Sequence, residues 1–406
     1  MQQIYPKISL KASKVAAVHR RHPWIFSGAI QTIEGQPKEG EIVSVFTPQN
    51  RHIATGYYSK QGSISVRVLT FEEEAIDLQF WKRKLQQAYD YRKAIGLIDS
   101  EQTNVFRLVN AEGDGLSGLI IDYYNGTAVL QAHSVGIFQQ RHEITAALKE
   151  VMGAKLKAVY DKSLTFNKNE QKNTIDEASI SSFNPYLLGN LEQKNVSENG
   201  HLFKVDWEKG QKTGFFIDQR DNRQLLAQYV ADKSVLNTFC YSGGFSVYAL
   251  KAGASLVHSV DSSQKAIDWT DENVLINNLQ SEQNKHQSFT ADVMTFLSEP
   301  PQQYDVIVLD PPAFAKSLKA RHRAMKAYRR LNAKALKQIK SGGILFTFSC
   351  SGVVERQLFE DTVRSAAIEV GRTVRILHYL SQPADHPINI FHPEGHYLKG
   401  LVLYVN

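Results

Sequence analysis

Two residues whose side chains could do chemistry follow apolar runs of the chain. Asp310 comes after the run 304–309 and opens the segment Asp310-Pro311-Pro312-Ala313-Phe314. Each proline fixes its own φ angle and biases the preceding residue towards extended geometry, so this segment is stiff. Cys350 comes after the run 343–349, between two serines and before a glycine. Both residues are therefore catalytic candidates at strand ends.

A thiol beside a carboxylate suits covalent catalysis on an electron-poor ring. A thiolate that adds to carbon 6 of cytosine makes the ring an enamine, whose carbon 5 can attack a methyl sulfonium. Asp310 would hold N3 and the exocyclic amine and stabilise the adduct electrostatically. Lys316 or a nearby arginine would lower the thiol pKa from its free value of about 8.5. The structural alternatives are a solvated Asp310 at a turn and a cysteine that only fills space. We interpret Cys240 as structural.

The elements that must position these residues alternate between strand and helix after residue 200. Strands are predicted at 234–239, 256–261, 304–310 and 343–349, and helical runs at 246–252, 266–277 and 331–339. This alternation predicts a parallel sheet covered on both faces, an α/β fold. Ligands of such sheets bind outside the carboxyl ends of the strands. If strands 304–310 and 343–349 are neighbours, they lie about 4.8 Å apart, and Asp310 and Cys350 share one crevice.

The first of these strands ends in a turn with two adjacent glycines, Gly243 and Gly244. Glycines let the backbone approach a bound ligand closely and turn into a helix. Asp261 ends the second strand, where an acid commonly binds ribose hydroxyls. Its structural alternative is a helix cap, which Ser262 or Ser263 could also supply. Asp292 fits a third contact, near an adenine amine.

The N-terminal half has a different organisation. Runs 42–46 and 64–69 alternate as strands do, and a helix is predicted over 75–95 with Gly96 as its stop. Strands at 118–123, 127–132 and 157–161 and a helix at 139–151 predict a small α+β unit, followed by an irregular loop at 170–182. We expect three domains, at 1–75, 76–190 and 191–406.

Composition limits the class of protein. The chain has 406 residues with a net charge of +6, a modest bias towards anionic partners such as nucleic acid. No apolar run reaches the ~18 residues of a membrane span, and the N-terminus lacks a signal-peptide pattern. Only two cysteines occur, which fits the reducing cytoplasm. No cluster of metal ligands is expected.

A long interval without acidic residues lies between Asp310 and Glu355. Its cations are Lys316, Lys319, Arg321, Arg323, Lys326, Arg329, Arg330, Lys334, Lys337 and Lys340. A buried stripe at helical spacing, formed by Tyr328, Leu331, Ala335, Leu336 and Ile339, would leave the cations exposed. Such a run is usually a solvated face, but beside a catalytic crevice it predicts phosphate contacts with RNA.

A second basic cluster contains Lys11, Lys14, Arg20, Arg21 and Trp24. Phe314 could stack on an extruded base.

Together these residues resemble the bacterial 23S rRNA cytosine-C5 methyltransferases that carry an N-terminal PUA domain, over nearly the whole chain. The most specific matching segments are 213–220, 237–245, 310–314, 347–352 and 384–387, joined by 110–118 and 393–400. The resemblance implies a β-rich PUA domain that binds structured RNA, a small central α+β domain and a class I, Rossmann-like methyltransferase domain. It implies S-adenosylmethionine as methyl donor and Cys350 as nucleophile.

Site residues follow from these motifs. The expected cofactor contacts are Phe216, Asp218, Arg220, Asn237, Phe239, Tyr241, Gly243, Gly244, Asp261, Ser262, Asp292, Val293, Asp310 and Pro311. The expected RNA contacts are Lys11, Arg20, Arg21, Trp24, Phe314, Lys316, Arg321, Arg323, Arg329 and Arg330. The chain departs from the usual class I pattern at Asn237, where an acid is common, and at Ala313, where a lysine is frequent.

Two alternatives stay open at this point. A methyltransferase acting on a base nitrogen uses a similar Pro-Pro-aromatic loop, but typically begins it with Asn and needs no cysteine. An RNA-binding ribosome-assembly factor with a vestigial S-adenosylmethionine site is the alternative from another class. The sequence leaves open the modified nucleotide, the choice between free rRNA and an assembling subunit, a monomer or a homodimer, and the base that removes the carbon 5 proton.

Overall fold

The computed structural model describes residues 5–163, 184–191, 194–279 and 285–406. It divides into two compact units. Unit 1 comprises Met1–Val196, Val205–Phe215 and Ala384–Gly395, and unit 2 comprises Ser197–Lys204, Phe216–Pro383 and His396–Asn406. The loop expected at 170–182 lies outside the described residues. The domain boundaries at residues 75 and 190 stay a prediction.

Unit 1 begins with a six-stranded sheet in the order β2-β6-β5-β4-β1-β3. Its strands are β1 (Lys7–Leu10), β2 (Trp24–Phe26), β3 (Ile30–Glu34), β4 (Ile42–Phe46), β5 (His52–Tyr58) and β6 (Ile64–Thr70), and the short helix α1 spans Val15–His19. Alternation in β4 buries Val43 and Val45 in a core with Val66 and Val68, because successive side chains of a strand point to opposite faces. The strand expected at 42–46 is confirmed, and that at 64–69 runs one residue further.

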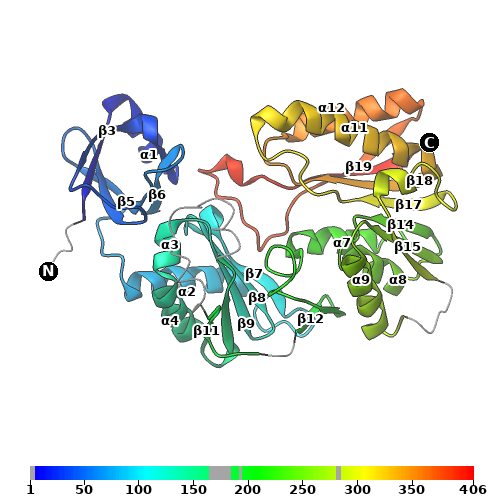
Figure 1. Ribbon diagram of the computed structural model, residues 1–406, viewed down its shortest axis with the longest axis horizontal. Helices are drawn as coiled ribbons and strands as arrows, with labels where there is room; N and C mark the ends of the chain where they lie inside the picture. Colours follow the sequence, from blue (N-terminus) through cyan, green and yellow to red (C-terminus); the bar gives the residue numbers. More distant parts are fainter. Residues whose placement is uncertain (1–4, 164–183, 192–193, 280–284) are drawn as a thin grey trace. The chain divides into compact units, whose positions relative to one another are not determined.

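A second sheet of unit 1 has the order β11-β10-β9-β8-β7. Its strands are β7 (Val105–Asn110), β8 (Leu119–Tyr124), β9 (Thr127–Ala132), β10 (Ala158–Asp161) and β11 (Tyr186–Leu188). The helices of this part of the chain are α2 (Leu78–Ala94), α3 (Val135–Gln139) and α4 (Arg141–Met152). Helices α2 and α4 pack on one face of the sheet (Figure 1). The Asp77 side chain accepts from Phe80 N at 2.9 Å and starts α2, while Gly96, at φ 79°, ends the turn after it.

The segment 384–395 returns to this second sheet of unit 1 late in the chain. Arg107 N donates to Asp385 Oδ2 at 2.9 Å, and Arg92 Nη2 donates to the Asp385 carbonyl at 2.7 Å. Asn110 Nδ2 donates to the Pro387 carbonyl at 2.9 Å. Two segments of the family resemblance, 110–118 and 384–387, are therefore joined to each other in the fold.

Unit 2 is built on a seven-stranded sheet in the order β16-β15-β14-β17-β18-β20-β19. The strands are β14 (Ser234–Thr238), β15 (Leu256–Asp261), β16 (His286–Thr290), β17 (Tyr304–Leu309), β18 (Ile339–Ser349), β19 (Val374–Leu380) and β20 (Lys399–Val405). The five strands from β14 to β18 pair in parallel, and β20 lies antiparallel between β18 and β19. The strand order reverses at β14, which places the switch point, the usual ligand position, between β14 and β17.

Helices cover both faces of this sheet: α11 and α12 on one, and α7, α8 and α9 on the other (Figure 1). The helices are α7 (Arg220–Leu226), α8 (Gly244–Lys251), α9 (Gln264–Ile276), α10 (Val293–Phe296), α11 (Arg321–Gln338) and α12 (Arg356–Val370). The short strands β12 (Asn195–Glu198) and β13 (His201–Lys204) pair with each other. Among the described residues, no helix is both long and apolar enough to cross a membrane. The part of the chain that the structure describes contains the 3₁₀ turns η1 (Ala12–Lys14), η2 (Ser27–Ala29), η3 (Ala111–Asp114), η4 (Gly153–Lys155), η5 (Ile217–Gln219), η7 (Leu318–Ala320) and η8 (Pro393–Gly395).

Helix α11 differs from its sequence prediction at both ends. It begins at Arg321 rather than at 331, because the buried stripe continues from the predicted Tyr328 back to Ala324. Ile339 is buried but is not on the helix. It has extended geometry, with ψ 138°, and pairs with Tyr304 as the first residue of β18, so its place in the helical stripe was wrong.

Candidate active site

Asp310 and Cys350 leave the same edge of the sheet. Strands β17 and β18 pair in parallel with Leu309 opposite Thr347, so the predicted adjacency of these strands is confirmed. The Cys350 Sγ lies 3.7 Å from the Pro311 carbonyl oxygen. Cys350 is half-buried, whereas Cys240 is buried, and burial raises the pKa of the Cys240 thiol to about 12. Of the two thiols, Cys350 is therefore the one placed for chemistry.

The Asp310 carboxylate is held by the start of α7. Gln219 Nε2 donates to Asp310 Oδ1 at 3.1 Å, and Asn222 Nδ2 donates to Gln219 Oε1 at 2.6 Å. Both amides are buried. This chain fixes one oxygen of the carboxylate, which sets the direction of the other. Sequence reasoning missed Gln219, although it lies in the segment 213–220.

The turn after β14 has a backbone that few side chains tolerate. Phe239 and Tyr241 have φ angles of 54° and 48°, and Gly243 has 75°. Such positive values cost free energy for residues other than glycine and cluster at functional sites. A Cβ on Gly243 would lie 2.7 Å from Thr270 Cγ2. The predicted glycine turn into helix α8 is thus present and closely packed.

Asp261 ties this turn to the next one. Its Oδ2 accepts from Tyr241 N at 3.1 Å, and its Oδ1 accepts from Ser263 N at 2.9 Å. Ser263, not Asp261, caps α9, because its side chain accepts from Ala266 N. Ser262 is exposed beside them. The capping alternative therefore belongs to Ser263, and Asp261 orients the glycine turn.

Aromatic rings stand beside the turn. The Phe216 and Tyr241 ring centroids are 5.0 Å apart, and those of Tyr241 and Trp269 are 5.6 Å apart, both pairs nearly perpendicular. Lys265 lies over the Trp269 ring at 4.6 Å. Ring faces beside a glycine turn and a carboxylate suit an adenosyl group, whose base is flat and whose ribose carries two hydroxyls. Trp269 was not predicted, because its spacing is that of any half-buried helical residue.

The other predicted cofactor residues vary in availability. Asp292 caps α10 by accepting from Thr295 N at 2.8 Å, and the next residue, Val293, is buried. Asn237 is buried and donates to Ser246 Oγ at 2.8 Å, which joins β14 to α8. Asp218 accepts from Tyr397 Oη at 2.8 Å, and Arg220 and Pro311 are buried. The contacts of these residues with a cofactor stay predictions.

The basic helix beside the site is only partly free to bind anions. Arg329 pairs with Glu369 at 3.4 Å, while Arg323, Arg330 and Lys316 are exposed. Arg321 is half-buried at the start of α11. The Phe314 ring centroid lies 4.6 Å from that of Tyr328, whose hydroxyl bonds to Ser351 Oγ at 3.2 Å. The ring of Phe314 is therefore packed against Tyr328, which bonds to the residue that follows Cys350.

The N-terminal basic cluster is also partly occupied. Trp24 Nε1 donates to Glu112 Oε1 at 2.8 Å, and its ring centroid lies 4.3 Å from that of His392. Lys11 donates to the Gly28 carbonyl, Arg21 stacks over Phe71, and Arg20 is exposed. Trp24 is thus a packing residue of unit 1, and its RNA contact stays a prediction.

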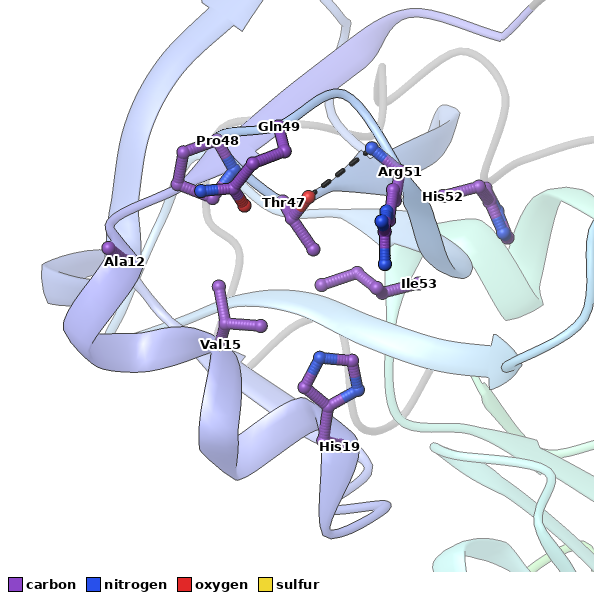
Figure 2. A pocket seen from close by; sticks show the side chains of 9 residues that line it. All are labelled: Ala12, Val15, His19, Thr47, Pro48, Gln49, Arg51, His52 and Ile53. Carbon is purple, nitrogen blue, oxygen red and sulfur yellow. Dashed lines mark hydrogen bonds between the residues drawn. The ribbon is translucent and has the colours of Figure 1, made fainter.

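A cavity of about 510 Å³ opens between α1 and the β4–β5 turn (Figure 2). His19 and Arg51 are basic residues of its lining, and Arg51 N donates to Thr47 Oγ1 at 3.2 Å. The cavity is not formed by the predicted RNA-contacting residues.

Comparisons with known proteins agree with this geometry. A PUA-like domain model matches residues 8–71, and an S-adenosylmethionine-dependent methyltransferase model matches residues 178–388, about half of the chain. The ribosomal RNA large subunit methyltransferase I of Aeromonas hydrophila is 41% identical over 401 residues, covering 98% of both chains. That of Klebsiella pneumoniae is 38% identical over 407 residues, covering 99% of both.

Solved structures support the same fold. A protein of Streptococcus mutans described as a SAM-dependent methyltransferase matches with a TM-score of 0.82 at 22% identity, covering 99% of this chain and 100% of that one. A methyltransferase complexed with SAH matches with a TM-score of 0.81 at 21% identity, with the same coverage. The predicted fold class, with a PUA-like domain before a Rossmann-like one, is confirmed. The chain therefore belongs to the family of S-adenosylmethionine-dependent methyltransferases that includes the ribosomal RNA large subunit methyltransferases I, and S-adenosylmethionine is its methyl donor.

Proposed function

We propose that this protein methylates carbon 5 of a cytosine in 23S rRNA, in the cytoplasm, through a covalent adduct on Cys350. The observation that carries the proposal is the position of a half-buried thiol beside Asp310, at the carboxyl edge of the sheet. A nitrogen methyltransferase has no need for that thiol. The names of the relatives, ribosomal RNA large subunit methyltransferase I, support rRNA as the substrate.

The proposed reaction uses the Cys350 thiol, the Asp310 carboxyl group and a base that takes up the carbon 5 proton. The Cys350 thiolate adds to carbon 6, and the displaced π electrons make carbon 5 nucleophilic. Bound S-adenosylmethionine supplies an electrophilic methyl group. Carbon 5 would take the methyl group as the bond between that methyl and the sulfonium sulfur breaks, which leaves the demethylated donor, S-adenosylhomocysteine. A base then removes the carbon 5 proton, the bond between carbon 6 and the Cys350 sulfur breaks, and the thiolate is regenerated. Asp310, oriented by Gln219, would accept a hydrogen bond from the exocyclic amine and, in its protonated form, donate one to N3, which stabilises the negative charge of the adduct.

The phosphates of the RNA would bind exposed cations in two regions of the chain. Arg323 and Arg330 on α11 and Lys316 before it lie near Asp310 in the sequence and are exposed. Arg20 contributes from the PUA-like domain. Because the target cytosine must leave its stack to meet a half-buried thiol, the anchored ring of Phe314 would stack on the extruded base.

The proposal is tested by bisulfite mapping of rRNA from cells that lack this protein. Loss of one 5-methylcytosine, restored by the wild-type gene but not by Cys350→Ala, is expected. If every 5-methylcytosine is retained and a methyl group on a base nitrogen is lost, the protein is a nitrogen methyltransferase instead.

Covalency is tested separately with RNA in which the target cytosine is 5-fluorocytosine. Fluorine at carbon 5 cannot be removed as a proton, so the adduct persists and appears as a protein–RNA band that survives denaturation. The band is expected with wild-type protein and S-adenosylmethionine, and it is absent from Cys350→Ala. A Cys350→Ala protein that keeps full methyl transfer contradicts the covalent mechanism.

A further inference from the structure

A buried lysine stands next to Cys350 on the neighbouring strand. Lys399 is the first residue of β20 and pairs with Ser349, the residue before Cys350, in the antiparallel register of β18 and β20. Its side chain is only 3% exposed. Lysine is among the residues that are almost never buried without a compensating partner, so this position requires an explanation.

The contacts of Lys399 anchor its ammonium group but do not neutralise it. Nζ donates to the Ser351 carbonyl at 2.7 Å and to the Tyr397 carbonyl at 2.8 Å. Among the described residues, no carboxylate lies within ion-pair distance of it. Both acceptors are neutral, and one belongs to the residue directly after Cys350. An ammonium group has a third donor, which neither of these two bonds uses.

Charged and titratable groups surround this ammonium and the thiol from several elements. The charge of Arg356, on α12, disfavours the ammonium, while a thiolate at Cys350 favours it. Tyr328, on α11, is buried near the thiol, and Asp310 follows the adjacent strand β17. Burial lowers the pKa of Lys399 to about 8, so near neutral pH it still carries a proton. Of these groups, the Cys350 thiolate is the one that favours the charged form of Lys399.

We propose that Lys399 is the positioning residue that keeps the Cys350 thiol ionised, by holding a positive charge beside the sulfur on a rigid strand. The inference rests on the proposed role of Cys350 as the nucleophile. Because attraction between two charges is mutual, the thiolate that favours the ammonium is favoured by it to the same extent. The hydrogen bonds to two backbone carbonyls hold the Lys399 ammonium group in place when the target cytosine binds.

The test measures ionisation of the thiol without RNA and without S-adenosylmethionine. The full-length protein is alkylated with iodoacetamide between pH 5 and 10, and the rate at Cys350 is followed by peptide mass spectrometry. Only a thiolate reacts, so the midpoint of the profile reports where Cys350 ionises. The buried Cys240 serves as an internal reference that stays unreactive in folded protein. Failure of the covalent carbon 5 mechanism would not alter this readout.

Lys399→Met, which keeps the length of the side chain and removes its charge, is expected to raise the midpoint by about one pH unit. The alkylation rate at pH 7 then falls about tenfold. Lys399→Arg, which keeps the positive charge, is expected to retain most of the wild-type rate. Lys337→Met removes an exposed lysine of α11 and is expected to leave the midpoint unchanged. An unchanged midpoint in folded Lys399→Met overturns the proposal.

If Lys399→Met does not fold, as judged by circular dichroism, the wild-type protein decides the question. The midpoint of native Cys350 is then compared with its midpoint in the urea-unfolded chain, where Lys399 is distant. A native midpoint below the unfolded one, retained in Lys399→Arg, supports the proposal. A native midpoint at or above the unfolded one overturns it.

Discussion

Gln219 and Asp310 are joined by a hydrogen bond of 3.1 Å from the amide Nε2 to the carboxylate Oδ1. The bond connects the start of α7 to the end of β17, so the orientation of the acid depends on a residue 91 positions earlier. Asn222 in turn holds the amide in the orientation that donates. The geometry of this site is therefore set by a chain of amides rather than by the Pro-Pro segment alone.

Replacing Gln219 by Glu would put two carboxylates in contact while keeping the shape of the side chain. Like charges at that distance raise the pKa of one partner, so a proton is shared between them. We expect kcat of methyl transfer to fall about tenfold at pH 7, with the deficit widening as pH rises. Steady-state rates across pH 6–9 check this. Gln224→Glu, which adds the same charge on the exposed face of α7, should behave as wild type.

Gly243→Ala should weaken binding of S-adenosylmethionine. The new Cβ meets Thr270 and forces a side chain into a left-handed backbone, at a cost of roughly 1–3 kcal/mol. We expect the Kd, measured by calorimetry, to rise about tenfold. Gly253→Ala is the matched control, because Gly253 has a φ of 85° but open space around its Cβ position. It should lower the melting temperature and leave the Kd unchanged. Equal Kd values in the two variants would contradict the assignment of the turn to cofactor binding.

The stability of unit 1 should depend on pH through His133. Burial and then the charge of Arg107 lower the pKa of His133 to about 4, against about 6.5 when unfolded. Between these values the unfolded chain binds a proton that the folded chain does not, so stability falls as pH drops from 6.5 to 4. His133→Gln should flatten this slope in thermal unfolding, whereas the exposed His322→Gln should keep it. Parallel slopes for His133→Gln and wild type would argue against this origin.

Exposed arginines of α11 should contribute to RNA affinity through phosphate contacts. Arg323→Gln with Arg330→Gln is expected to weaken RNA binding and to lower the slope of log K against log salt by about 0.7 for each lost contact. Filter binding at several salt concentrations measures both quantities. Arg364→Gln, on the exposed side of α12, serves as control. A weaker affinity with an unchanged salt slope would mean that these residues do not contact phosphate.

The sequence allowed the fold of unit 2 to be predicted, because strand and helix periods alternate and the glycine turn and strand-end acids stand at fixed points along them. It also indicated that Asp310 and Cys350 emerge together, since adjacent parallel strands share an edge. Trp24 is half-buried in a contact with Glu112 that is 88 positions away in the chain. No local pattern could reveal such a partner, so the residue looked like a surface aromatic among cations.

Lys399 was missed for a related reason. In the sequence it is one lysine in an apolar strand, and its neighbour across the sheet is identified only by the antiparallel register of β18 and β20. Ile339 was assigned to the wrong element because the helical period of α11 continues through it, while its pairing with Tyr304 makes it a strand residue. In both cases long-range pairing decided what local spacing left open.

The late return of the segment 384–395 to unit 1 has a consequence for how the protein can assemble. Arg92 and Arg107 lie in the first part of unit 1, and both donate to Asp385. Asp385 follows residues 216–383 of unit 2 in the sequence. During synthesis from the N-terminus, the first part of unit 1 is therefore made long before the segment 384–395 that completes it. A chain that ended before residue 384 would therefore lack the segment of unit 1 that supplies these contacts.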